Sequence, residues 1–263
     1  MTSSPDHKRA RTTDSSPPYL LHYWPTIPGR AEPIRLCFEA SSTPYTDVTN
    51  SNPDSGMKTL MSLISSSSDA PPPKIPHFAP PILQHGDLYL SQLPNILLYL
   101  GPRLGLVPSD DANAIYRINQ LTLTALDGFS NEAHETHHPI AVGDYYENQK
   151  DAAIKRANDY THNRLPKFLG HFEQVLKQNQ GGEYLYGGQL TYADLVLFQG
   201  LDGVSFAFPN AVKKLREGGE YRRVWDLYER VKGLDNVKAY LESERRLGYS
   251  SGIWRHYDEL DES

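Results

Sequence analysis

The chain has 263 residues, of which 38% are hydrophobic and 22% charged, a composition typical of a globular protein of one large or two modest domains. Its formal net charge of −6 argues against binding to nucleic acid, and no apolar run is long enough to span a membrane. Cys37 is the only cysteine, which excludes an intrachain disulfide and a cysteine-based metal cluster. We therefore expect a reduced, cytoplasmic environment.

The first ninety residues predict a small mixed sheet. Residues 1–18 are rich in Ser, Thr, Pro and charge and predict a disordered tail. A short apolar strand at 20–24 leads through a Pro- and Gly-containing loop into a helix with Pro33 in its first turn. A second strand at 45–49 is expected to pair with the first in parallel, because a helix connects them.

The next segment predicts a loop and then a hairpin. Residues 50–74 predict a long surface loop with one short helix at 57–64. Strands at 78–83 and 87–90 form the hairpin, with a cis bond expected before Pro81. A helix at 91–101 follows.

Beyond residue 110 every long segment has a helical period. Pro166 should kink the longest helix, and Thr191 and Asp194 form a capping box before an apolar run. Further helices are expected at 221–232 and 235–247, followed by a tail at 251–263. The pattern predicts two domains, at 19–105 and 112–250, the first α/β and the second all-α.

Four segments in this order resemble a glutathione transferase over nearly all of residues 19–247. They are HYWPTIPGRAEPIRL, PPILQHGDLYLSQLPNILLYLG, RLPKFLGHFEQVLKQNQGGEYLYGGQLTYADL and RVKGLDNVKAYLES. The first is similar to the tyrosine-type classes, nearest the sigma, mu and pi forms, or to a divergent fungal-type member. The resemblance implies a thioredoxin-like N-terminal domain, an all-helical C-terminal domain and a homodimer.

Tyr23 is the leading catalytic candidate. It ends the first strand and faces a helix start, where amide donors favour an anion, although most strand aromatics only pack. In the tyrosine-type classes a phenol at this place stabilises the thiolate of glutathione, and the resemblance implies this role for Tyr23.

The resemblance also implies a set of glutathione-binding residues. Trp24 would flank the site, and Gln92 would hold the γ-glutamyl arm. Arg30 would either support that arm or brace the domain. Lys74 is near the family's lysine for the glycyl carboxylate, or is simply an exposed lysine. Cys37 is expected to be a buried structural residue and not a nucleophile.

The sequence departs from the family at the same site. The residue before the expected cis Pro81 is Pro80, which has no N–H to donate to the cysteinyl unit of glutathione. Ala79 stands where a polar residue is common, and Leu93 replaces a serine that binds the γ-glutamyl carboxylate. These changes predict weak glutathione affinity, a changed pose or another ligand.

A histidine cluster follows the first long helix of the second domain. His134 and His138 satisfy the H-E-x-x-H spelling of a zinc site, but Pro139 follows at once and no third ligand stands at a familiar spacing. We therefore expect no metal. His134, His137 and His138 either line a cleft for a hydrophobic substrate, together with Phe206 and Phe208, or only cap a helix end.

These observations predict an enzyme that adds the glutathione thiolate to a small hydrophobic electrophile, or a glutathione-dependent isomerase. Glutathione would be a co-substrate, in detoxification or in a step of secondary metabolism. The alternative is a binding or assembly protein that keeps the fold but has a weakened glutathione site. No nucleic acid and no membrane are expected as partners.

Overall fold

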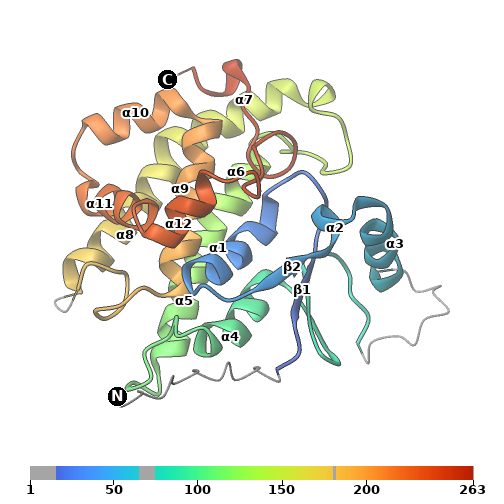
Figure 1. Ribbon diagram of the computed structural model, residues 1–263. Coiled ribbons are helices and arrows are strands. Elements are labelled where there is room, and N and C mark those ends of the chain that lie inside the picture. Colours follow the sequence, from blue (N-terminus) through green and yellow to red (C-terminus); the bar gives the residue numbers. More distant parts are fainter. Residues whose placement is uncertain (1–15, 65–74, 180–181, 263) are drawn as a thin grey trace, which may run out of the picture.

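The computed structural model of the chain describes residues 16–64, 75–179 and 182–262. Its first half is a four-stranded sheet with helices on both sides (Figure 1). Helices α1 and α4 lie on the side that faces the helical half, and α2 and α3 lie on the other. The elements of this half are β1 Tyr19–His22, α1 Glu32–Ala40, β2 Tyr45–Asp47, α2 Val48–Ser51, α3 Pro53–Ile64, β3 Ile82–His85, β4 Leu88–Ser91 and α4 Leu93–Arg103.

The sheet has the order β2-β1-β3-β4 of a thioredoxin-like domain. Strand β1 pairs in parallel with β2, as predicted, and antiparallel with β3. The predicted hairpin is confirmed as β3 and β4, with Leu83 opposite Leu90. The first strand of the hairpin begins at Ile82 and not at Phe78, because Pro80 and Pro81 cannot donate ladder hydrogen bonds. Helix α4 also runs past the predicted end at Gly101 to Arg103.

The helix predicted at 57–64 is confirmed within α3, but the loop predicted over residues 50–56 is wrong, because α2 and α3 occupy most of it. The strand predicted to reach Thr49 ends at Asp47, whose side chain caps α2. Asn52 accepts a hydrogen bond from Ser55 N at 3.3 Å, and Pro53 begins α3. An Asn cap followed by proline is a helix-start signal. Residues 65–74 of the predicted loop, including Lys74, lie outside the described residues.

The second half is helical, as predicted. Its central helix, α9, is buried on nearly all sides and contacts helices of both halves. The Thr191–Asp194 capping box is confirmed, since Thr191 N and Oγ1 donate to the Asp194 carboxylate at 2.8 and 2.7 Å. The helices are α5 Ala114–Leu126, α6 Glu132–Glu135, α7 Lys150–Asp159, α8 Leu165–Gln178, α9 Tyr192–Ala207, α10 Pro209–Glu217, α11 Arg222–Lys232 and α12 Asp235–Leu241.

Two π-helical turns join helices of this half. Asp127–Asn131 links α5 to α6, and Tyr160–Arg164 links α7 to α8. The second turn immediately precedes the first turn of α8, which contains Pro166. A widened turn accommodates a residue without an N–H, so the irregularity expected at Pro166 takes this form. The first turn lies in the wall of the candidate site described below.

The segment expected as a tail after residue 250 is packed over its described part. The Trp254 indole donates to the Phe129 carbonyl at 2.8 Å, and its ring lies so close to α9 that a Cβ on Gly203 would fall 2.2 Å from it. The buried Asp261 carboxylate accepts from the amides of Asn210 and Ala211 at 2.7 and 3.0 Å and thus caps α10. The C-terminal segment is therefore part of the helical half.

A buried network of charges joins the two halves. The Glu32 carboxylate of α1 is fully buried; it accepts from Arg35 at 2.9 Å and from the Tyr240 hydroxyl at 2.6 Å, and it pairs with Arg246. Arg246 also pairs with Asp202 of α9 at 2.9 Å. Burial alone would raise the pKa of Glu32, but Arg246 and Arg35 outweigh burial and lower the pKa.

No single described helix has the length and hydropathy of a membrane span, and the consecutive helices α9 and α10, which reach them only together, are bent by 116°.

Candidate functional site

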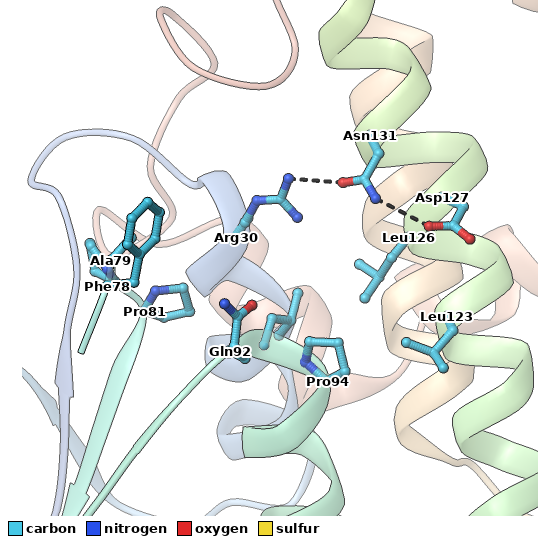
Figure 2. A pocket seen from close by; sticks show the side chains of 12 residues that line it. Arg30, Phe78, Ala79, Pro81, Gln92, Pro94, Leu123, Leu126, Asp127 and Asn131 are labelled. Atoms are coloured by element: carbon cyan, nitrogen blue, oxygen red, sulfur yellow. Dashed lines mark hydrogen bonds between the residues drawn. The ribbon is translucent and has the colours of Figure 1, made fainter. Parts of the chain in front are cut away.

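A cavity of about 390 Å³ opens between the two halves of the molecule. This volume lies within the usual range for small-molecule sites. Figure 2 shows its two walls facing each other. The thioredoxin-like half contributes Arg30, Phe78, Ala79, Pro80, Pro81, Gln92, Leu93 and Pro94, and the helical half contributes Leu123, Leu126, Asp127 and Asn131.

The cis peptide bond predicted before Pro81 is present. It turns the chain into β3 and brings Ala79, Pro80 and Pro81 to the cavity. Pro80 is buried and offers only its carbonyl, because proline has no N–H. The methyl group of Ala79 cannot form a hydrogen bond. The segment 79–81 therefore accepts hydrogen bonds from a ligand but donates few.

The start of α4 lies beside this segment in the same wall of the cavity. Gln92 is exposed and has φ +71°, a left-handed conformation that is costly for a residue other than glycine. Such strain often marks a binding site. The first amides of a helix have no partner within it and attract anions, but Pro94 removes one of them. The Leu93 side chain is only 2% exposed and packs in the core, so Leu93 offers its backbone rather than its side chain.

Tyr23 is not among the residues that line the cavity, but it contacts Arg30, which does line it. Its side chain is 5% exposed, and its hydroxyl accepts a hydrogen bond from Arg30 N at 2.9 Å. Gly29, at φ +46°, permits this approach, since a Cβ there would lie 2.3 Å from the Tyr23 hydroxyl. Burial raises the pKa of Tyr23 and outweighs the opposing effect of the Arg30 amide. Tyr23 therefore keeps its proton at neutral pH, and no acceptor for that proton is found among the described residues.

Arg30 connects the two walls. Its guanidinium donates to Asn131 Oδ1 at 2.8 Å, and Asn131 Nδ2 in turn donates to Asp127 at 3.2 Å (Figure 2). Both partners belong to the π-helical turn after α5. Arg30 thus braces the two halves and also offers a cation to the cavity. These two roles, which the sequence left as alternatives, are compatible in the structure.

Other predicted site residues lie elsewhere. Trp24 is half-buried and packs against the core. Phe208 is 1% exposed in the helical core beside Tyr160, with ring centroids 5.4 Å apart. Phe206 stacks on Tyr249 at 4.8 Å. Neither phenylalanine is among the residues that line this cavity, and their part in holding a hydrophobic substrate stays a prediction.

The three histidines come together at the end of α6, outside the cavity lining. One ring nitrogen from each histidine lies within 4.8 Å of one nitrogen of each of the other two. Burial lowers the pKa of His134 to about 4 and of His137 to about 3, so both rings are neutral at pH 7. Glu135, the base of the H-E-x-x-H spelling, is exposed and pairs with Arg156 at 2.8 Å. The carboxylate is thus held by an arginine, as in a surface ion pair and unlike a metalloprotease base.

Sequence reasoning missed the wall contributed by the helical half. Leu123 and Leu126 lie on α5, before the π-helical turn, whereas Asn131 lies within the turn, which changes its direction relative to the face of α5. A fixed helical period does not reveal the position of Asn131. Phe78, the most exposed large hydrophobic residue of the described part, also lines the cavity. Phe78 directly precedes Ala79, a residue already expected at the site, so the sequence did offer a reason to include it.

Comparisons with known proteins agree with this architecture. A family model described as "Glutathione S-transferase, C-terminal domain" matches residues 134–244. The glutathione S-transferase of Plasmodium falciparum is 26% identical over 88% of this chain and 98% of its own length. That of Dirofilaria immitis is 28% identical over 74% of this chain and 81% of its own length.

Solved structures show the same fold. The Pi-class glutathione S-transferase of Onchocerca volvulus superposes with a TM-score of 0.62, at 24% identity over 85% of this chain and 92% of that one. The prostaglandin synthase D of Nilaparvata lugens gives 0.61, at 22% identity over 87% and 98%. The matched family model and the relatives from Plasmodium falciparum and Dirofilaria immitis support membership of the glutathione S-transferase superfamily, and the solved structures agree with its fold.

Proposed function

We propose that the protein is a glutathione transferase that adds the thiolate of glutathione to a small hydrophobic electrophile. The observation that carries the proposal is the state of Tyr23, whose hydroxyl accepts from Arg30 N at 2.9 Å and keeps a proton free to donate. A free thiol has a pKa of about 8.5 and is mostly protonated at neutral pH. A hydrogen bond donated to sulfur favours the thiolate and so supplies the nucleophile.

The residues around the cavity support a pose for glutathione. The Leu93 amide and the Gln92 side chain, at the start of α4, would receive the γ-glutamyl carboxylate, and Arg30 adds a positive charge. The Pro80 carbonyl would accept the cysteinyl N–H beside the cis Pro81. The sulfur would then lie near the loop that carries Arg30 and Tyr23. Lys74 remains a proposed partner of the glycyl carboxylate.

The electrophile would occupy the apolar part of the same cavity. Leu123, Leu126 and Phe78 supply apolar surface opposite the glutathione residues. An electrophilic carbon placed there would accept the thiolate and form a C–S bond, either while a leaving group such as chloride departs with its electron pair, or by addition to an activated double bond whose π electrons then take a proton from water. A glutathione-dependent isomerisation would form and then break this bond on the same residues. Detoxification and a step of a specialised pathway both fit this chemistry.

A second candidate is a binding or assembly protein with the same fold. Pro80 and Pro94 each remove an N–H that could have faced a ligand, which favours weak glutathione binding. We also propose a homodimer in the cytoplasm, with one domain at 19–105 and a helical domain that begins at 112 and includes the packed C-terminal segment. Size-exclusion chromatography with light scattering tests the dimer directly.

The variant Tyr23→Phe tests the mechanism. It removes only the hydroxyl, and we expect kcat for conjugation of a chlorodinitrobenzene electrophile to fall about 10- to 100-fold, because a hydrogen bond to a charged group contributes about 1.5–3 kcal/mol. The rate should also shift to higher pH, since more base is then needed to form the thiolate. Tyr116→Phe, at an exposed position, is the matched control.

Two results would contradict the enzyme. An unchanged rate in Tyr23→Phe would remove Tyr23 from the mechanism. The absence of both conjugation and a rise in Tm with millimolar glutathione would favour the binding protein, because a ligand that binds only the native state must raise its stability.

A further inference from the structure

Three imidazoles converge where α6 ends and the chain turns away. The centroids of the His134, His137 and His138 rings lie 4.9, 5.3 and 4.8 Å apart, and one nitrogen from each ring lies within 4.8 Å of those from the other two. Three imidazoles around a tetrahedral Zn²⁺, at Zn–N distances of about 2.0–2.1 Å, have nitrogens about 3.4 Å apart and ring centres about 5 Å apart. The ring triangle already has this size, so small ring rotations bring the nitrogens to an ion.

The second nitrogen of the most buried ring is held as in a metal site. His137 is 1% exposed, and its Nε2 lies 2.9 Å from the Ile253 carbonyl. A carbonyl only accepts, so Nε2 carries the proton and Nδ1 carries a lone pair. That Nδ1 is buried and has no partner among the described residues. Metal-binding histidines almost always donate their other N–H in this way, which fixes the tautomer and the ring orientation.

His138 repeats the pattern. Its Nδ1 is also buried without a partner among the described residues, and its ring lies beside the backbone of Ala141 and Asp144. An unpaired buried acceptor costs about 1–3 kcal/mol. Two of them in one cluster point to a ligand that accepts electron pairs, which a metal cation does.

The charged groups around the cluster include Arg30, Arg255 and Glu135, which act on His134 at longer range. The two arginines oppose a cation, while Glu135 favours it. The carbonyl end of the helix formed by α5, the π-helical turn and α6 also favours a cation. Because the donors are all imidazole nitrogens, the set suits Zn²⁺ and not Mg²⁺ or Ca²⁺, which prefer oxygen.

We propose that His134, His137 and His138 bind one Zn²⁺ ion through three imidazole nitrogens, with water in the fourth position. The third ligand that the H-E-x-x-H spelling lacked is His137. The ion would secure the C-terminal segment to the helix through the His137–Ile253 hydrogen bond. It would lie about one helical turn beyond Asn131, and thus beside the cavity rather than in it.

The test uses the full chain without a histidine tag, stripped with a chelator. Elemental analysis after incubation with Zn²⁺ and dialysis should give one zinc per chain. Co²⁺ should give the intense visible absorption of a tetrahedral complex. His134→Gln and His138→Gln should each weaken Zn²⁺ binding in a competition titration by more than about 100-fold, the upper cost of losing a supporting hydrogen bond alone. His171→Gln, at an exposed histidine, should bind as the unaltered chain does.

The proposal is overturned if less than stoichiometric zinc is retained, if Co²⁺ gives only the pale spectrum of an octahedral complex, or if the cluster variants bind as His171→Gln does. The cobalt spectrum of the unaltered chain decides even if a variant does not fold. None of these measurements uses glutathione, so their result is independent of the proposed transferase.

Discussion

Two of the polar contacts between the thioredoxin-like half and the helical half start two residues apart, at Arg30 and at Glu32. Glu32 is fully buried and bonded to Arg35, Tyr240 and Arg246. Arg30 is half-buried beside the cavity, and its side chain donates one hydrogen bond to Asn131 of the helical half. We call the buried contact at Glu32 the closed contact and the half-exposed contact at Arg30 the open contact. Both lie on one short stretch of chain.

The difference follows from the cost of burying charge. A charge removed from water destabilises the fold unless it is fully paired, so the closed contact at Glu32 is saturated with partners. A half-exposed guanidinium keeps part of its hydration and can exchange a protein partner for a ligand. We infer that the contact at Glu32 holds the two halves together, which leaves the side at Arg30 free to change its partners.

Removing the charge of Glu32 should break the closed contact. Glu32→Gln leaves Arg35 and Arg246 buried without their carboxylate, and we expect a loss of about 3–5 kcal/mol in the free energy of unfolding, measured by urea denaturation. Glu39→Gln is the matched control: it lies on the same helix and pairs with Arg245, which is 59% exposed. The control should lose no more than about 1 kcal/mol. Equal losses of unfolding free energy in the two variants would show that the buried network at Glu32 stabilises the fold no more than an exposed ion pair does.

The same variant gives a prediction of pH dependence. The folded state lowers the pKa of Glu32 below its ordinary value of 4.5, so this group's contribution to stability is complete above that value and is lost as the pH falls through the lowered pKa. The difference in unfolding free energy between the unaltered chain and Glu32→Gln should therefore be constant from about pH 7 to 5 and narrow below about 4.5. If this difference in unfolding free energy instead increased as the pH fell, Glu32 would be buried as a neutral acid.

In the cavity, restoring a backbone N–H at position 80 should strengthen the binding of glutathione. Pro80→Val returns an N–H to the residue before the cis proline and keeps an extended backbone, which a residue before proline prefers. We expect glutathione to bind about fivefold more tightly, the effect of about 1 kcal/mol from one hydrogen bond. Isothermal titration measures this, with Pro44→Val, at an exposed loop position, as control. Weaker binding in Pro80→Val alone would mean that glutathione does not use this backbone position.

Local patterns in the sequence predict most of the strands, turns and helix caps that lie away from the cavity. The parallel pair of strands, the hairpin, the cis bond and the Thr191–Asp194 capping box each depend on residues close in sequence. The positions of Asp127 and Asn131 in the cavity wall do not, because both residues belong to a π-helical turn that has no periodic signature. The convergence of the histidines also requires three dimensions, since His137 is fixed by the carbonyl of Ile253, 116 residues away.

The smallest effect, and the sharpest test of the open contact, is a double-mutant cycle between Arg30 and Asn131. Arg30→Met and Asn131→Ala, alone and together, should give a coupling of about 0.5 kcal/mol in the free energy of unfolding, because the hydrogen bond is half-exposed. Saturating glutathione should reduce this coupling if the ligand recruits the guanidinium, and should leave it unchanged if Arg30 only braces the domains. A coupling near that of the Glu32 network would instead make both contacts structural, and the cavity would then need another group to receive the γ-glutamyl carboxylate.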